Sequence, residues 1–456
     1  MKKIFNRALA MGLVASMLAG CSSSGTAAST ASASGSVNDL SAEITVWAVP
    51  LTDDFEEEFN DEFLPKFQEQ YPNVEVNLEM QTWEGVNEKL QTALSTGDYP
   101  DVYIDGAART ASLPSKGVLE EVDDVFNSFD DWNSNLTNAG VVDGHHYLIP
   151  ITAITASRLN VNMTLAKELG VDNLVPEDHM TWTIDDFANF VKKAAEAGKE
   201  KGIYGTYLYA GSSTSDDIIY SMMMSNGATI IDKDTMTCKA NSPEAVEVIQ
   251  TLGDLVKDGY TTPGAATLQG GDAVQAMANR QVVLCINQAA SAIMRNQLEM
   301  VDQGYMDKID DMIDVGIPHP ADGKMVAASW GANFAAIFKN NDKDKVAASK
   351  ALVKALAGDE EMSSTIWKES PTYSPARQNG VTYKNDNKQI EDSVNTEAEW
   401  TAEYGNSDFG MLEPYWPQVR DAFYPELQAV YTGEKTAQEA MDSFAKKVDK
   451  ILEDYK

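Results

Sequence analysis

Positive charge and cysteine are both scarce in this chain. Its 456 residues include 35 lysines and arginines against 70 aspartates and glutamates, so the formal net charge is −35. A field of this sign repels nucleic acid and anionic lipid headgroups, which argues against both as partners. Of the three cysteines, Cys285 lies in the apolar run QVVLCIN, so we expect an isolated buried thiol. A disulfide with Cys238 is the less favoured alternative.

Sequence motifs of several enzyme classes are missing too. The chain contains no G-x-S-x-G, H-E-x-x-H or G-x-x-x-x-G-K sequence. Ser443 and Lys446 match S-x-x-K, but they lie in a terminal amphipathic segment that we interpret as a surface helix. His145 and His146 are adjacent beside a strand and should point to opposite sides, which disfavours a metal pair. We therefore expect no enzymatic activity, no cofactor and no bound metal.

Long hydrophobic runs are absent beyond the N-terminus. Lys2, Lys3 and Arg7 precede an apolar stretch over residues 8–18, which is too short to span a bilayer and is typical of a secretion signal. The Leu-Ala-Gly-Cys sequence that ends at Cys21 resembles the lipobox of bacterial lipoproteins, whose cysteine is diacylated and becomes the new N-terminus. A plain signal peptide with an incidental cysteine is the alternative. Residues 1–20 are thus predicted to be a lipoprotein signal peptide.

The segment after the signal is low in sequence complexity. Residues 21–41 are almost entirely Ser, Ala, Gly and Thr after the cysteine, which predicts a flexible tether. Two acyl chains on Cys21 suffice for stable anchoring, so we expect membrane contact through the lipid alone, at the extracytoplasmic face of a bacterial cell membrane. The remaining body exceeds 400 residues, which predicts two domains.

The first half of this body alternates strands with helices. EITVWAV, NVEVNLEM and PDVYID have strand patterns, and amphipathic segments separate them. Phe55, Phe59, Phe63 and Phe67 repeat every four residues, which indicates one helical face in the core, and the acidic residues among 53–58 fit a solvated helix start. This order predicts an α/β fold with a parallel sheet. Ligand sites in such sheets lie beyond the carboxyl ends of the strands.

The second half alternates in the same way. TIDDFANFVKKAAEAG and SPEAVEVIQTLGDLVKDG have helical patterns, whereas GIYGTYLY is predicted to be a strand and AMANRQVVLCIN a helix that leads into a strand. Ser242 precedes Pro243 as a helix N-cap would, and Gly259 fits the C-terminal end of that helix. Trp182 is assigned to packing.

Several strings in order resemble one family. They are ITVWAV with FLPKFQEQYPNVEV, LQTALSTGDYPDVYI, HHYLIP, LNVNMTLAKELGVD, SPEAVEVIQTLGDLVKDG, IPHP, WGANFAAIF and SPTYSPAR. In this order and spacing, residues 41–456 resemble the extracellular solute-binding proteins of ABC importers, in the sugar-binding branch that includes the maltose-binding protein. The resemblance implies a receptor, expected to be a monomer, that delivers its ligand to ABC permease subunits in the membrane.

The fold that this resemblance implies has two α/β lobes, a hinge and a ligand cleft between the lobes. One lobe would combine residues 42–152 with 325–365, and the other 153–324 with 366–456. Crossings between them would lie near residues 151–156, near 318–326 and after Lys368. Clefts between domains are preferred sites for small ligands.

Sugar recognition requires aromatic faces for the C–H patches of the ring and planar polar groups for its hydroxyls. Both kinds of residue lie near predicted strand ends, and the resemblance implies ligand contact for Asp105 and Arg109. The candidate ligand-binding residues are Trp47, Trp83, Asp105, Arg109, Tyr207, Tyr209, Asn287, Trp330 and Asn333. Core packing is the alternative for each aromatic among them.

One departure from the family affects the choice of ligand. Where relatives often have glycine and a stacking aromatic after the strand that ends at Asn287, this chain has Ala289 and Ala290. A maltose-like ligand is therefore not implied. The expected function is capture of a mono- or oligosaccharide for an ABC transporter, and the alternatives are a secreted carbohydrate-active enzyme or a binder of another solute on the same fold.

Overall fold

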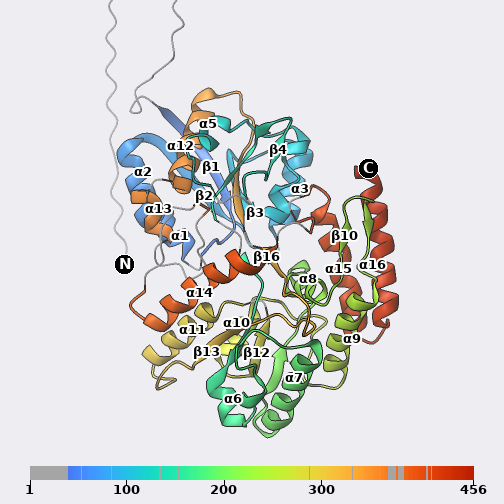
Figure 1. Ribbon diagram of the computed structural model, residues 1–456. Coiled ribbons are helices and arrows are strands. Elements are labelled where there is room, and N and C mark those ends of the chain that lie inside the picture. The colour runs from blue at the N-terminus through green and yellow to red at the C-terminus, as the bar shows by residue number, and fades with distance from the viewer. Residues whose placement is uncertain are drawn as a thin grey trace, which may run out of the picture. The chain divides into compact units, whose positions relative to one another are not determined.

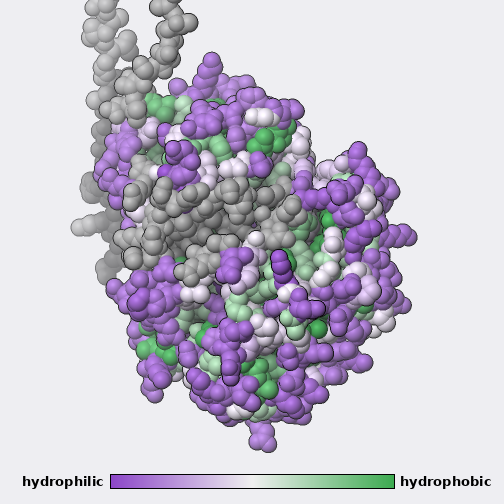
Figure 2. Space-filling view, viewed as in Figure 1, coloured by the Kyte–Doolittle hydropathy of each residue, from purple (hydrophilic) through white to green (hydrophobic). Residues whose placement is uncertain are grey.

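The computed structural model describes residues 40–456 with short gaps. The gaps are residues 53, 84, 133–135, 153–154, 287, 331, 359, 368–375, 378–384, 407–408 and 412. Cys21 and the predicted signal and tether lie outside the described residues. Within the described part, no helix has both the length and the apolar composition needed to cross a membrane. Figure 2 shows hydrophilic side chains over most of the coloured surface on one face, as the strongly charged composition requires.

A mixed five-stranded sheet forms the first core (Figure 1). Its strands, in order across the sheet, are β2 (Asn73–Met80), β1 (Ser41–Ala48), β3 (Val102–Gly106), β15 (Asn333–Ile337) and β6 (Leu148–Pro150). Strand β1 lies between β2 and β3 and runs parallel to both, which confirms the predicted parallel arrangement of the first three strands. The late strand β15 runs antiparallel to both β3 and β6 and thus joins distant parts of the chain.

Helices cover this sheet through regular apolar faces. The elements are α1 (Phe55–Glu58), a π-helical turn (Phe59–Phe63), α2 (Leu64–Gln70), α3 (Val86–Thr96), α12 (Lys343–Gly358) and α13 (Glu360–Trp367). The four phenylalanines of the first helical stretch are all buried, and their ring centroids lie 5.2–6.2 Å from one another in succession. Their assignment to the core is confirmed. Helix α12 packs against β1, and α13 packs against the π-helical turn.

A second, four-stranded sheet forms the other core. Its order is β13 (Met312–Val315), β8 (Leu159–Asn162), β12 (Val282–Ile286) and β9 (Tyr204–Tyr207). Strand β12 runs parallel to β9 and antiparallel to β8. Its helices include α6 (Met163–Leu169), α7 (Ile184–Gly198), α10 (Asp272–Ala278) and α11 (Ala290–Asp302). Helix α7 approaches β9 closely because position 205 is glycine: a Cβ there would lie 2.1 Å from the carbonyl oxygen of Val191.

Four more helices extend this second part of the molecule. They are α8 (Asp216–Ser225), α9 (Pro243–Lys257), α15 (Trp416–Tyr431) and α16 (Ala437–Leu452), and α9, α15 and α16 pack against one another. Ser242 caps α9 by accepting a hydrogen bond from the backbone of Ala245, and Gly259 has a φ of 76° just after that helix. Both features confirm the predicted helix limits.

Short strands connect the two sheets. Strand β7 (Thr155–Ala156) lies between β6 and β8 in the chain, and β14 (Ala327–Trp330) lies between β13 and β15. The two pair with each other, and β14 also pairs with β16 (Gly405–Asn406), which follows α14 (Lys388–Tyr404). This small sheet holds together the segments that lead from one core to the other.

Both described cysteines are free and buried. Burial raises the pKa of Cys238 and of Cys285 to about 12, so both thiols stay protonated. The isolated core thiol is confirmed and the disulfide alternative is wrong. Trp182 is buried as predicted, donates from its indole to the Gly316 carbonyl at 2.6 Å, and contacts two phenylalanines edge-on.

Candidate ligand-binding site

The carboxyl ends of β1, β2 and β3 meet at one edge of the first sheet. The backbone N–H of Gln81 donates to the Ala48 carbonyl at 2.8 Å, so the segment after β2 follows the end of β1. Trp47 is 9% exposed, and the ammonium of Lys89 lies 3.9 Å from the centroid of its ring. Trp83 is 40% exposed. Trp83 therefore offers an accessible aromatic face, whereas Trp47 lies mostly in the core.

A buried carboxylate fixes an arginine at the same edge. Asp105 is fully buried at the end of β3, and Arg109 lies one helical turn later in α4 (Ala107–Thr110). Their contact is bidentate: Nε to Oδ2 and Nη2 to Oδ1, both at 2.5 Å. Tyr103 also donates its hydroxyl to Asp105, and burial together with that carboxylate raises the pKa of Tyr103. Arg109 is thus held in one orientation by a charge-assisted fork.

The orientation of Arg109 places it beside the exposed indole. Its guanidinium carbon lies 5.3 Å from the centroid of the Trp83 ring. Asp105 uses two of the five N–H groups of Arg109, and the side chain of Arg109 is 15% exposed. Trp83 and Arg109 together present a flat apolar face and N–H donors held in a fixed direction, which are the two features that binding a polyhydroxylated ring requires.

A second arginine–aspartate fork approaches from the other part of the chain. Arg420 in α15 contacts the fully buried Asp216 at the start of α8, with Nε–Oδ2 at 2.8 Å and Nη2–Oδ1 at 2.7 Å. Helices α4 and α15 contact each other, and the positive charge of Arg420 acts to lower the pKa of Arg109, which Asp105 raises. Burial raises the pKa of the neighbouring Asp421, against the effect of both arginines. Sequence reasoning missed all three of these α8 and α15 residues.

The two candidate tyrosines are buried near this second fork. Tyr207 and Tyr209 are each 3% exposed, with ring centroids 6.2 Å apart. The hydroxyl of Tyr207 donates to the Gln269 carbonyl at 3.0 Å, and that of Tyr209 donates to the Thr214 carbonyl at 3.2 Å. Burial raises the pKa of Tyr207 to about 12. Both rings therefore fix loops around the Asp216 region.

The remaining candidates fall in different environments. Asn333 opens β15 opposite Gly106, is buried, and donates from Nδ2 to Thr152 Oγ1 at 2.9 Å. It lies at the same edge as Asp105. Trp330 ends β14, where its backbone pairs with Thr155. Asn287 lies outside the described residues.

The expectation that adjacent histidines point apart is wrong. Nδ1 of His145 lies 2.7 Å from Asp123 Oδ2, and Nδ1 of His146 lies 2.8 Å from Asp123 Oδ1. One carboxylate reaches both rings because it presents an oxygen to each. The S-x-x-K match remains a helix feature, since the Ser443 hydroxyl donates to Glu426 at 2.7 Å from within α16.

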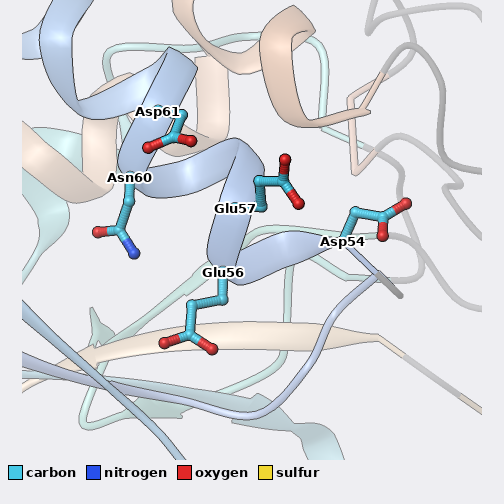
Figure 3. Close-up of a pocket in the computed structure, with 5 residues that line it drawn as sticks. All are labelled: Asp54, Glu56, Glu57, Asn60 and Asp61. Carbon is cyan, nitrogen blue, oxygen red and sulfur yellow. The ribbon is translucent and has the colours of Figure 1, made fainter.

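A hollow near the start of α1 is lined by acidic and amide side chains (Figure 3). Its lining residues are Asp54, Glu56, Glu57, Asn60 and Asp61, and all five are exposed. In the close-up their polar ends spread apart from one another. The predicted solvated helix start is confirmed for Asp54, Glu56 and Glu57, while Glu58 is partly buried and Asp53 lies outside the described residues. The hollow belongs to that start.

Comparisons with known proteins agree with this architecture. Residues 48–363 match the family model described as bacterial extracellular solute-binding protein. The diacetylchitobiose binding protein DasA of Streptomyces coelicolor is 25% identical over 382 residues, covering 80% of each chain. A solute-binding protein from Thermotoga lettingae, bound with α-D-tagatose, has a TM-score of 0.74 at 19% identity and covers 90% of this chain and 100% of its own. Maltose-bound MalE3 from T. maritima has a TM-score of 0.72 at 19% sequence identity, and the match covers 89% of this chain and 98% of MalE3.

Proposed function

This chain belongs to the bacterial extracellular solute-binding protein family, and we propose that it captures a mono- or oligosaccharide and delivers it to an ABC permease. The family consists of binding proteins rather than enzymes. The observation that carries the carbohydrate proposal is the exposed Trp83 face beside Arg109, which Asp105 holds in place. Similar proteins bound to tagatose and maltose support it.

The proposed contacts divide between the two cores. Trp83 would stack on the C–H face of a sugar, while Arg109 and Asn333 would bind its hydroxyls. From the other core, Arg420 and Asp421 in α15 approach Arg109. We propose lobe limits at 42–152 plus 325–365 and at 153–324 plus 366–456, with β7 and β14 as connections between the lobes.

A thermal-shift screen over a carbohydrate panel tests this function. A ligand that binds only the folded chain adds about 2.7 kcal/mol to its stability at a hundred times its dissociation constant. We expect at least one sugar to raise the melting temperature in a saturable way. If peptides or polyols raised the melting temperature and no sugar did, the chain would be a solute-binding protein for a different ligand. Breakdown of a stabilising sugar would instead favour a carbohydrate-active enzyme.

Ligand binding is expected to close the two lobes. A solute can drive closure only if it contacts the closed form better, so groups from both lobes must touch it. The segments near Ile151 and Pro318 would take up the dihedral change as a hinge. We predict that the sugar lowers the radius of gyration in small-angle X-ray scattering. A tightly bound sugar that leaves the scattering profile unchanged would contradict the hinge.

We also propose that the protein is a monomer anchored through Cys21 to the outer face of the cell membrane. The sequence before that residue supports this anchor, and the family is extracellular. Because acylation forms a thioether at the cysteine sulfur, Cys21→Ser should abolish lipidation and leave a precursor or a released form. Detergent-phase partitioning of the two forms measures this, and equal partitioning of the variant would refute the anchor.

A further inference from the structure

A small cluster of carboxylates and imidazoles lies in the part of the molecule built on the first sheet, and it contains none of the residues assigned to the sugar. Glu121 and Asp123 stand at the start of α5 (Asp123–Phe126), and His145 lies in the hairpin of β4 (Val141–Val142) and β5 (His145–His146) (Figure 1). One ligand atom from each of these three side chains lies within 4.8 Å of the other two. The side chain of His145 is 49% exposed and that of Glu121 is 58% exposed, so ions in solution can reach them.

The hairpin and the preceding segment fix one another. The turn residues Asp143 and Gly144 have φ values of 53° and 85°, which give the tight turn that connects the two strands. The backbone N–H of Val122 donates to the His146 carbonyl at 2.9 Å. The ring of His146 stacks on Phe126 with centroids 3.7 Å apart. The positions of Glu121, Asp123 and His145 therefore follow from backbone pairing and ring packing.

Each carboxylate has one oxygen held by the protein and the other turned toward His145. Asp123 Oδ1 accepts from the backbone N–H of His146 and contacts its Nδ1, both at 2.8 Å, while Oδ2 lies 2.7 Å from Nδ1 of His145. Glu121 Oε1 accepts from the Tyr147 hydroxyl at 3.5 Å, while Oε2 lies 3.7 Å from the same Nδ1. Hydrogen bonds of this kind orient the ligands of metal sites.

We propose that Glu121 Oε2, Asp123 Oδ2 and His145 Nδ1 bind a divalent transition-metal ion of the Zn²⁺ type. Imidazole with carboxylate is a donor set that suits such ions, whereas Mg²⁺ and Ca²⁺ prefer oxygen alone. Ligand atoms about 2.0–2.2 Å from a tetrahedral zinc lie about 3.3–3.6 Å apart. The Nδ1 of His145 lies 2.7 Å from Asp123 Oδ2 and 3.7 Å from Glu121 Oε2, one distance on each side of that range. A water molecule would complete the coordination. The ion would join α5 to the hairpin independently of any sugar.

Equilibrium dialysis against ZnCl₂ tests the site on the full chain without a polyhistidine tag. Every sample carries Cys21→Ser, so that this thiol cannot bind zinc, and contains excess MgCl₂ to occupy weak acidic sites. At about pH 8, where protons compete less for the imidazole, we expect one saturable zinc per chain. His145→Ala and the isosteric Glu121→Gln should each weaken this binding by about tenfold or more.

His179→Asn is the matched control. His179 is exposed and has a φ of 57°, a conformation that asparagine tolerates, and it lies outside the cluster. This variant should bind zinc like the starting chain. The visible absorption of bound Co²⁺ gives a second readout, since a nitrogen ligand lost in His145→Ala must alter the band. No saturable zinc in the starting chain, or equal affinity in His145→Ala, would overturn the proposal.

Discussion

Arg109→Ala is expected to weaken carbohydrate binding by about 10- to 100-fold, the effect of removing a charged hydrogen-bond donor worth about 1.5–3 kcal/mol. The substitution also leaves the fully buried Asp105 without its bidentate partner. An uncompensated buried charge costs about 3–5 kcal/mol, so the free energy of unfolding should fall by that order. Titration calorimetry and urea denaturation measure the two effects separately.

A third arginine–aspartate fork, formed by Arg377 and Asp131, can separate an effect on ligand binding from an effect on stability. Arg377 contacts Asp131 with the same geometry, Nε–Oδ1 at 2.7 Å and Nη2–Oδ2 at 3.1 Å, and it also donates to the Gly358 carbonyl. Arg377→Ala should lower the free energy of unfolding while carbohydrate affinity stays at its original value. If folded Arg109→Ala protein bound the sugar with unchanged affinity, Arg109 would be a structural residue.

Arg158→Met is expected to destabilise the chain by about 3–5 kcal/mol at pH 8, because Arg158 is the cation between two buried carboxylates. Its Nη2 lies 2.6 Å from Glu397 in α14, and its Nε lies 3.5 Å from Asp314 in β13. Burial raises the pKa of Asp314 to about 7, against the attraction of Arg158, and burial also raises the pKa of Glu397. Without the arginine, both carboxylates would destabilise the folded chain at any pH at which they are ionised.

The sign of the pH dependence follows from the raised pKa of Asp314. Between the unfolded value near 4 and the folded value of about 7, the folded chain binds more protons than the unfolded chain. The stabilisation that the Asp314 carboxyl contributes is therefore fully present below about pH 4 and is lost as the pH rises through 7. Asp314→Asn should match the starting chain near pH 4 and exceed its free energy of unfolding by a growing margin as the pH rises to 8. Equal pH profiles in urea denaturation would contradict this account.

Local patterns account for what could be predicted of the fold. The phenylalanine repeat, the Ser242 cap and the first three strands depend on residues near one another in the sequence, where periodicity and capping are informative. The pairing of β15 with β3 and β6 depends on tertiary packing between distant segments. No local pattern indicates such a pair, so the mixed character of the sheet could not be predicted.

The candidate site divides in the same way. Asp105 and Arg109 are four residues apart, so a strand end followed by a helical turn indicates that they can pair. Asp216 and Arg420 are 204 residues apart, and Pro425 in the interior of α15 weakens the helical signal of that segment. Aromatic type alone could not separate the exposed Trp83 from the buried Trp47 and Tyr207, because exposure depends on packing.

Titration calorimetry of the most stabilising carbohydrate tests the central claim most directly, with recovery of the sugar after the experiment. We predict saturation at one sugar per chain, a binding heat that is reduced or lost in Arg109→Ala and kept in Arg377→Ala, and recovery of the sugar with every bond intact. Absence of saturable binding across the carbohydrate panel, or recovery of a cleaved sugar, would contradict the assignment of this chain as a carbohydrate receptor.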